Sequence, residues 1–223
     1  MNRLLILVEG QTEEAFVKSL LAPHLTSFGV FPVPKLIYTK RLPDRPDFKG
    51  GVATFGKIEK EVRLLLGDSG ACAITTMIDF YRLPHDFPRP KQLAQTSCYQ
   101  RVAQFEQTFA DRISNPRFLP YLSLHEFEAL LFSSPEKIAQ PFPEQNESAN
   151  LLAIRNQFAS PEEIDDDPKT APSKRILKLY PAYQKRLHGL LAAQSIGIAA
   201  MRRECLHFNE WLTKLESLGQ PKA

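Results

Sequence analysis

Five consecutive apolar residues at positions 4–8, followed at once by Glu9 and Gly10, constrain the fold more than any other feature of this sequence. An unbroken apolar run of this length is typical of a strand that is buried on both faces, as in the middle of a parallel sheet. A second run, ACAITTMIDF at residues 71–80, carries Asp79 at its end. Two buried strands that each end on a carboxylate predict an α/β sheet with chemistry at one edge.

The segments between these runs predict alternating helices and strands. We expect an acidic helix after the first strand, with Thr12 as its N-cap, running to about Leu25. Residues 34–40 (PKLIYTK) predict a second strand, and apolar side chains at helical spacing predict a helix over residues 55–66. Residues 117–124 (RFLPYLSL) predict a fourth strand. The β-α-β-α-β order favours a parallel sheet with crossover helices.

The character of the chain changes after residue 134. Residues 1–134 predict the α/β core, whereas residues 135–223 contain short helical segments separated by loops. The last of these segments has an apolar stripe that includes Phe208 and Trp211. We therefore expect residues 135–223 to form a helical C-terminal extension that packs on the core, and not an independent domain.

Composition limits the function classes. The chain has 28 Lys and Arg residues against 25 Asp and Glu, so contact with nucleic acid would need a local basic patch. There is no run of about 18 uncharged apolar residues, and the first apolar run is too short for a signal peptide. Three cysteines without a CxxC pattern are typical of free thiols. We expect a cytoplasmic protein with no membrane partner.

Acidic side chains are expected to gather at the carboxyl edge of the sheet. Glu9 and Asp79 end the first and the central strand, and Glu126 and Glu128 follow the fourth. Clustered carboxylates persist when a cation offsets their repulsion. Oxygen donors without a histidine or cysteine cluster favour Mg²⁺ or Mn²⁺. The sequence thus predicts a divalent metal site that could activate water or a hydroxyl for attack on a phosphate.

Each acid also has a structural alternative. Glu9 could pair with a lysine or cap the next helix, and Asp79 could begin an Asx-turn. On one α-helix Glu126 and Glu128 would point about 200° apart, so only one of them is expected to face a single ion. The choice between them stays open at this point.

Basic groups that could hold a substrate phosphate occur in two stretches. Arg41 lies in a charged loop after the second predicted strand. Lys174 and Arg175 lie at a predicted helix start, where free amides favour an anion. His125 could shuttle a proton or donate to a phosphate. A solvated loop, a capped surface helix and a core histidine are the structural alternatives, and they remain open.

Five motifs resemble, in order and spacing, those of a bacterial family known as domain of unknown function 4276, over about residues 3–216. They are VEGQTEE, TTMIDFYRLPHDFP, PYLSLHEFEALLFSSPE, TAPSKRI and CLHFNEWLTKLE. This family resembles the TOPRIM-like group, which includes the nuclease domains of overcoming-lysogenization-defect (OLD) proteins. The resemblance implies a small parallel sheet between helices. It also implies a Mg²⁺ site built from a strand-end Glu-Gly and a later Asp-x-Asp.

The resemblance assigns expected roles to particular residues. Glu9 with Gly10 corresponds to the glutamate motif, and Asp79 to the first aspartate. Tyr81 stands where the second aspartate is expected, so Glu126 or Glu128 would supply the missing carboxylate.

The resemblance also implies a function. The expected activity is that of a Mg²⁺-dependent nuclease on nucleic-acid phosphodiesters, with DNA favoured over RNA. An ABC-type ATPase would be its partner in phage defence or DNA repair. The departure at Tyr81 implies an alternative, a non-catalytic or conditionally active subunit of such an ATPase system. A third possibility, a phosphotransfer enzyme, shares the metal site and differs in its substrate.

Overall fold

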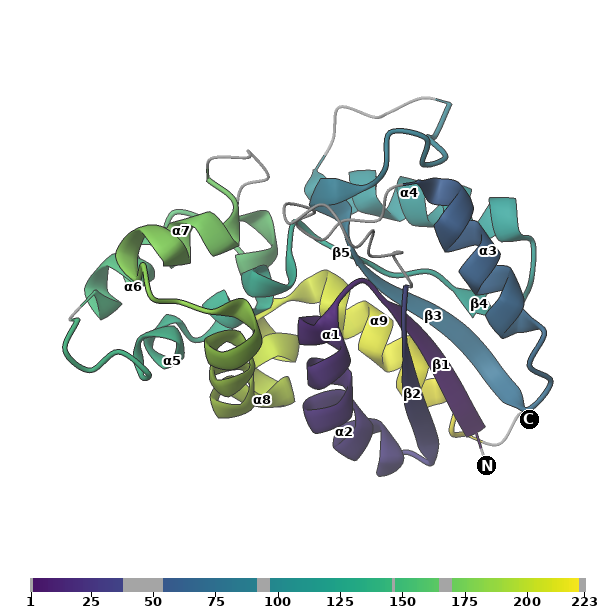
Figure 1. Cartoon of the computed structure of the whole chain (residues 1–223), viewed down its shortest axis with the longest axis horizontal. Coiled ribbons are helices and arrows are strands. Elements are labelled where there is room, and N and C mark those ends of the chain that lie inside the picture. The colour runs from purple at the N-terminus through teal and green to yellow at the C-terminus, as the bar shows by residue number, and fades with distance from the viewer. Residues whose placement is uncertain (1, 38–53, 92–96, 146, 165–169, 221–223) are drawn as a thin grey trace, which may run out of the picture.

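A small parallel sheet forms the centre of the structure, and helices cover both of its faces (Figure 1). The computed structural model describes residues 2–37, 54–91, 97–145, 147–164 and 170–220. Within these residues, no helix is long and apolar enough to cross a bilayer. The predicted α/β architecture, with a parallel sheet and flanking helices, is confirmed.

The central strands are the two apolar runs. β1 (Asn2–Val8) lies between β2 (Val30–Leu36) and β3 (Ala71–Asp79), and each pairing is parallel. Two short strands, β4 (Phe118–Leu119) and β5 (Leu122–Ser123), pair with successive parts of β3. All strands therefore direct their carboxyl ends toward the same edge of the sheet.

β2 begins earlier than the predicted second strand, which was expected at residues 34–40. It starts at Val30, and residues 38–40 lie outside the described part of the chain. Pro32 and Pro34 occupy alternate positions of this edge strand, so their missing amides can face away from β1. The predicted strand began at Pro34, whereas the edge strand of the structure accommodates both prolines.

The predicted fourth strand, residues 117–124, is divided in two. Pro120 lies between β4 and β5 and has no amide hydrogen to donate to a neighbouring strand. Both pieces still align with β3, through Ile74 opposite Phe118 and Ile78 opposite Leu122. The single predicted strand is thus corrected to two short strands, with Pro120 and Tyr121 between them.

The first crossover is a continuous helical run made of α1 (Gln11–Phe16), the π-helical segment η1 (Val17–Leu21) and α2 (Ala22–Thr26). Gly10, and not Thr12 as predicted, is the N-cap residue. Thr12 lies two residues further along, within the first turn, and is buried.

The two faces of β1 pack against different helices. α3 (Phe55–Leu66) and α4 (Cys98–Ile113) cover one face, and the α1–α2 run lies on the other with the C-terminal helices (Figure 1). Alternate side chains of a strand point to opposite faces, so an unbroken apolar run serves two cores. Leu5 and Leu7 belong to one core, and Leu4, Ile6 and Val8 to the other.

The rest of the chain is helical and begins at the carboxyl edge of the sheet. Figure 1 shows α5, α6 and α7 forming a lobe beside this edge, α8 between this lobe and the α1–α2 run, and α9 lying along the sheet. The elements are η3 (Phe127–Ser133), α5 (Pro135–Ala139), α6 (Ser148–Arg155), η4 (Pro161–Glu163), α7 (Pro172–Leu179), η5 (Lys185–Gly189), α8 (Leu190–Glu204) and α9 (Leu206–Ser217).

Trp211 joins α9 to the sheet. Its indole Nε1 donates to Thr75 Oγ1 of β3 at 2.9 Å, and its ring stacks on Tyr121 at a centroid distance of 4.2 Å. Trp211→Phe should destabilise the protein by about 1–2 kcal/mol, because it removes both ring volume and the hydrogen bond. Urea denaturation measures this change. Leu206→Ala, at an exposed position of the same helix, should change the free energy of unfolding by less than about 0.5 kcal/mol. Equal effects of the two substitutions would contradict the packing of α9 on the sheet.

Candidate active site at the carboxyl edge of the sheet

Glu9 and Asp79 leave neighbouring strands at almost the same level. Val8, the last residue of β1, is aligned with Met77 of β3, two residues before Asp79. Adjacent strands lie about 4.8 Å apart, so the residues that follow them begin close together. The sheet thus brings the two predicted acids to one edge.

The surroundings of Asp79 disfavour its negative charge. Burial raises the pKa of Asp79 well above its usual value, and the charges of Glu9, Glu13 and Glu128 raise it further. Its Oδ1 accepts a hydrogen bond from the amide of Phe127 at 3.2 Å and does not cap the following 3-10 turn, η2 (Phe80–Arg82). The Asx-turn alternative is therefore not what the side chain does. Asp79 ties the end of β3 to the start of η3.

Glu126 and Glu128 both reach the same cation. Lys185 Nζ lies 3.0 Å from Glu128 Oε2 and 3.6 Å from Glu126 Oε1, and both carboxylates are buried. The expectation that only one of them could face a single charge is wrong. It assumed an α-helix, whereas Glu126 is extended, with φ −142° and ψ 160°, and Glu128 lies in the 3-10 segment that follows.

Glu126 also holds the N-terminus of α7. Its Oε2 accepts a hydrogen bond from the backbone amide of Ser173 at 3.0 Å. A helix start was expected here to bind a substrate phosphate through free amides. The anion that meets the Ser173 amide is instead a carboxylate of the chain itself. This contact fixes the helical lobe to the acidic edge of the sheet.

The two basic residues predicted beside that helix start have different surroundings. Lys174 is exposed. Arg175 donates from Nε to the carbonyl of Thr170 at 2.6 Å, and its guanidinium lies 5.5 Å from the centre of the Phe158 ring. Arg41, the other predicted phosphate ligand, lies outside the described residues.

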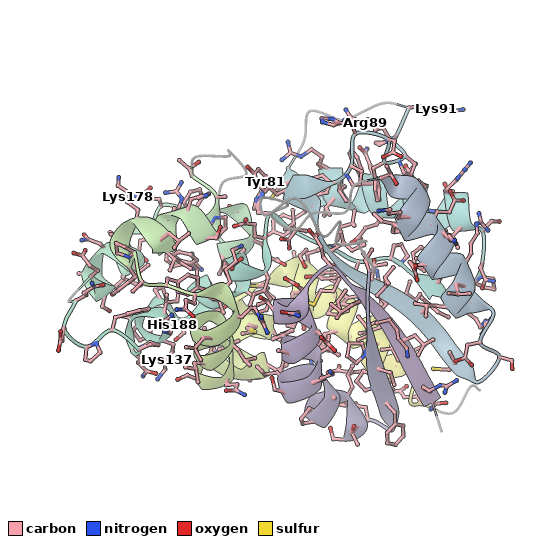
Figure 2. The ribbon with its side chains drawn as sticks, viewed as in Figure 1. Tyr81, Arg89, Lys91, Lys137, Lys178 and His188 are labelled. Atoms are coloured by element: carbon pink, nitrogen blue, oxygen red, sulfur yellow. The ribbon has the colours of Figure 1, made fainter. Side chains whose placement is uncertain are left out.

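His125 lies within the site but in a constrained backbone. It is buried, and its φ of 62° is in the left-handed region that few non-glycine residues adopt. Its carbonyl accepts a hydrogen bond from the amide of Tyr81 at 3.2 Å. Figure 2 shows Tyr81 at the same end of the sheet. The loop that carries His125 therefore joins the position of the missing aspartate to the Glu126 segment.

Two residues of the site were not predicted from sequence. Glu13, in the first turn of α1, was interpreted only as a favourable helix charge. Burial raises the pKa of Glu13. Hydrogen bonds to the backbone at Glu13 and Gly10, together with the charge of Lys185, oppose this increase, whereas the charge of Glu126 adds to it. Lys185 lay in a segment predicted to be an ordinary helix. Neither residue carries a local signal, because the contacts arise only when α1 and η5 pack together at the edge.

Charge in the site is unevenly balanced. Burial raises the pKa of Glu128 to about 7, with Lys185 opposing the shift and Glu126 and Glu13 adding to it. Burial alone would lower the pKa of Lys185, but the Glu128 and Glu126 charges reverse this and raise it. One ammonium group thus faces several carboxyl groups, and the cluster favours additional positive charge or protons.

Tyr183 places a hydroxyl in the same region. It is 5% exposed, and within the described part of the chain its hydroxyl has no hydrogen-bond partner. Burial, and then the charges of Glu128 and Glu126, raise its pKa. An added Cβ at Gly189 would lie 2.8 Å from this hydroxyl, so the glycine makes room for the tyrosine. A buried phenol without a described partner has a hydrogen to donate to a ligand.

The donor chemistry fits a hard divalent cation, although the side chains are not arranged as a finished site. Carboxylate oxygens are the ligands that Mg²⁺ and Mn²⁺ prefer, and Glu128 Oε1 has no partner among the described residues. Among those same residues, no three His, Cys, Asp or Glu side chains are grouped closely enough to hold an ion. Binding would therefore require carboxylates to move together, with Lys185 shifting away from them.

No curated protein sequence matches the chain. The C-terminal region of the Burkholderia pseudomallei OLD protein is 18% identical, with 99% of this chain and 100% of that chain covered and a TM-score of 0.43. The C-terminal region of the Xanthomonas campestris pv. campestris OLD protein is 16% identical, with 96% and 98% covered and a TM-score of 0.38.

The family model described as Domain of unknown function (DUF4276) matches residues 8–216, from the end of β1 to the last turn of α9. The matched segment contains the described acids of the site, Lys185 and the helical lobe. The chain belongs to this family.

Proposed function

We propose that this protein is a Mg²⁺- or Mn²⁺-dependent nuclease that hydrolyses nucleic-acid phosphodiesters, with DNA favoured over RNA. The observation that carries the proposal is that Glu126 and Glu128 pair with Lys185, that Glu13 and Asp79 also feel its charge, and that Glu9 acts on Asp79. A cluster with this surplus of negative charge is stabilised by a divalent cation. The resemblance of Glu9-Gly10 and Asp79 to the TOPRIM pattern supports the same chemistry.

The carboxylates would bind the metal, and Glu126 would in addition keep its bond to α7. Glu9, Asp79 and Glu128 would hold the metal, with Glu13 as a further ligand. Glu126 Oε1 could join them while Oε2 keeps the Ser173 amide. A bound divalent ion would polarise the phosphate and lower the pKa of a coordinated water. Tyr81 provides no carboxylate at the position of the second aspartate. Glu13 and Glu128 would supply carboxylates in its place.

Lys185 would act on the substrate side of the site. Its raised pKa keeps the ammonium charged at neutral pH. When the metal binds, the carboxylates that hold Lys185 acquire another cation, so the ammonium could turn to a phosphate oxygen. Tyr183 and His125 are the neighbouring groups that could donate to the same phosphate.

A cleavage assay on the full chain tests the proposal. Supercoiled plasmid and a single-stranded oligonucleotide should be cut in the presence of Mg²⁺ or Mn²⁺ and remain intact with EDTA. The double variant Glu9→Gln, Asp79→Asn should be inactive. Full cleavage by this variant would reject the assignment of the site.

A second candidate function is a non-catalytic subunit that binds an ABC-type ATPase and docks on nucleic acid. Tyr81 and the lack of a finished metal cluster among the described residues favour it. Calorimetric titration with Mn²⁺ separates the two functions. A nuclease should take up the ion in a manner that depends on Asp79, whereas a non-catalytic subunit should show no such uptake.

A further inference from the structure

A concave basic surface lies between α6 and α7, beside the acidic edge. The groove has a volume of about 360 Å³. Its described polar lining consists of Asn150, Gln157, Thr170, Lys174, Arg175 and Lys178. None of the described residues that line it is acidic. Three cations, with no carboxylate among the described lining residues, form a local basic surface in a chain whose net charge is only +3.

The helix geometry of α7 directs its lysines into this groove. Residues in an α-helix are separated by 100° around the axis, so Lys174 and Lys178 lie about 40° apart. Ile176, which is about 200° from Lys174, is buried on the opposite side. Arg175 is held in place by Thr170 and Phe158, so its charge forms a fixed wall of the groove. The apolar contacts of α7 thus leave a cationic face exposed.

A second groove provides a comparison elsewhere on the molecule. It lies along α4, has a volume of about 420 Å³, and is lined by Arg89, Lys91 and Asp111 among others. Here a carboxylate opposes the two cations. Figure 2 shows Lys178 over the helical lobe and Arg89 with Lys91 on the opposite side of the molecule, with Tyr81 between them.

The α6/α7 groove is linked directly to the acidic site. Ser173, whose amide binds Glu126, immediately precedes Lys174 in α7. A helix rises 1.5 Å per residue, so Lys178 lies only about 7.5 Å along the axis from Ser173. A strand whose phosphate reached the carboxylate cluster could therefore place adjacent phosphates beside Lys174 and Lys178.

We propose that the α6/α7 groove binds the single-stranded nucleic acid that flanks the scissile phosphodiester. This inference rests on the proposed nuclease function and names the path of its substrate. Lys174 and Lys178 contact backbone phosphates, and Asn150 and Gln157 offer amide groups to the sugar-phosphate chain. No exposed aromatic ring lines the described part of the groove, so binding depends on the phosphate backbone and is insensitive to base sequence.

Fluorescence anisotropy with a labelled single-stranded 12-mer tests the groove independently of cleavage. The full chain is titrated in EDTA at several salt concentrations, and Lys174→Gln, Lys178→Gln is compared with the matched control Arg89→Gln, Lys91→Gln. Loss of two phosphate contacts should reduce the slope of log K against log salt by about 1.4, since each contact contributes about 0.7 for a single strand. Affinity at low salt should fall about tenfold, and the control should stay within about twofold of wild type.

The outcomes separate this proposal from the proposed nuclease activity. An unchanged salt slope in the Lys174, Lys178 variant, or an equal loss of affinity in the control, would overturn the proposal that the groove binds nucleic acid. It would do so even if metal-dependent cleavage were observed. Conversely, the protein could show the expected slope change and cleave no substrate. This result would support the groove as a nucleic-acid surface and would contradict only the proposed hydrolytic function.

Discussion

Asp79→Asn is expected to reduce metal-dependent cleavage by at least about 10³-fold while leaving the protein as stable as wild type or more stable. The carboxylate is the proposed metal ligand, and an amide is a much weaker one. Its negative charge is disfavoured by burial and by Glu9, Glu13 and Glu128, so removing it relieves repulsion in the folded state. Asparagine can still accept the Phe127 amide through Oδ1, which preserves the link between β3 and η3.

Two measurements on the same preparation test this separation of activity from stability. Cleavage rates with Mn²⁺ report the activity, and the thermal midpoint in EDTA reports stability. Asp111→Asn makes the same chemical change at an exposed position of α4, where Gln107 can still donate to the new side chain. This control should keep both activity and midpoint. Cleavage by Asp79→Asn above about a tenth of the wild-type rate would contradict the assigned role.

The parallel sheet could be predicted from sequence because its signal is local. The apolar runs of β1 and β3 each bury two faces, and each ends beside an acid. Parallel pairing of these two strands is then sufficient to predict that Glu9 and Asp79 lie at one edge of the sheet. The edge strand was less predictable, since Pro32 and Pro34 weaken the strand pattern that β2 nevertheless adopts.

The composition of the site was less predictable because tertiary contacts complete it. Lys185 is remote in sequence from Glu126 and Glu128, and no local pattern pairs them. The relation between those two glutamates depended on a 3-10 segment, which apolar periodicity does not distinguish from an α-helix. Glu13 followed the usual rule for a helix start, and its place in the acidic cluster became visible only once η5 packed beside α1.

In the absence of metal, stability is expected to fall as pH rises from about 5 to 8.5. Burial raises the pKa of Glu128 to about 7 from an ordinary value of 4.5, despite the opposing charge of Lys185. The folded state therefore holds this proton more tightly than the unfolded chain. At pH values below the pKa of the unfolded chain, the Glu128 carboxyl is protonated in both states and does not lower the free energy of unfolding. Above pH 7 it is ionised in both, and the full penalty of about 3 kcal/mol applies.

Other groups act in the same direction and must be separated from Glu128. The raised pKa values of Asp79 and Glu13 add to the loss of stability at high pH. Burial lowers the pKa of His207, but its hydrogen bond with Glu106 and the nearby charges outweigh this and raise it. The stabilisation that His207 gains is therefore also lost as pH rises through its folded pKa.

Glu128→Gln isolates the contribution of the acidic cluster, because the His207 pair lies between α4 and α9 and is unaffected. Urea denaturation at pH 5, 7 and 8.5 should give a flatter dependence for the variant, by up to about 3 kcal/mol across the range. Mg²⁺ should stabilise the wild type more at pH 8.5 than at pH 5, since ions bind the deprotonated carboxylates and compete with protons. Parallel pH profiles for wild type and variant would show that the Glu128 charge carries no such penalty. A Mg²⁺ effect independent of pH would mean that the ion binds away from these carboxylates.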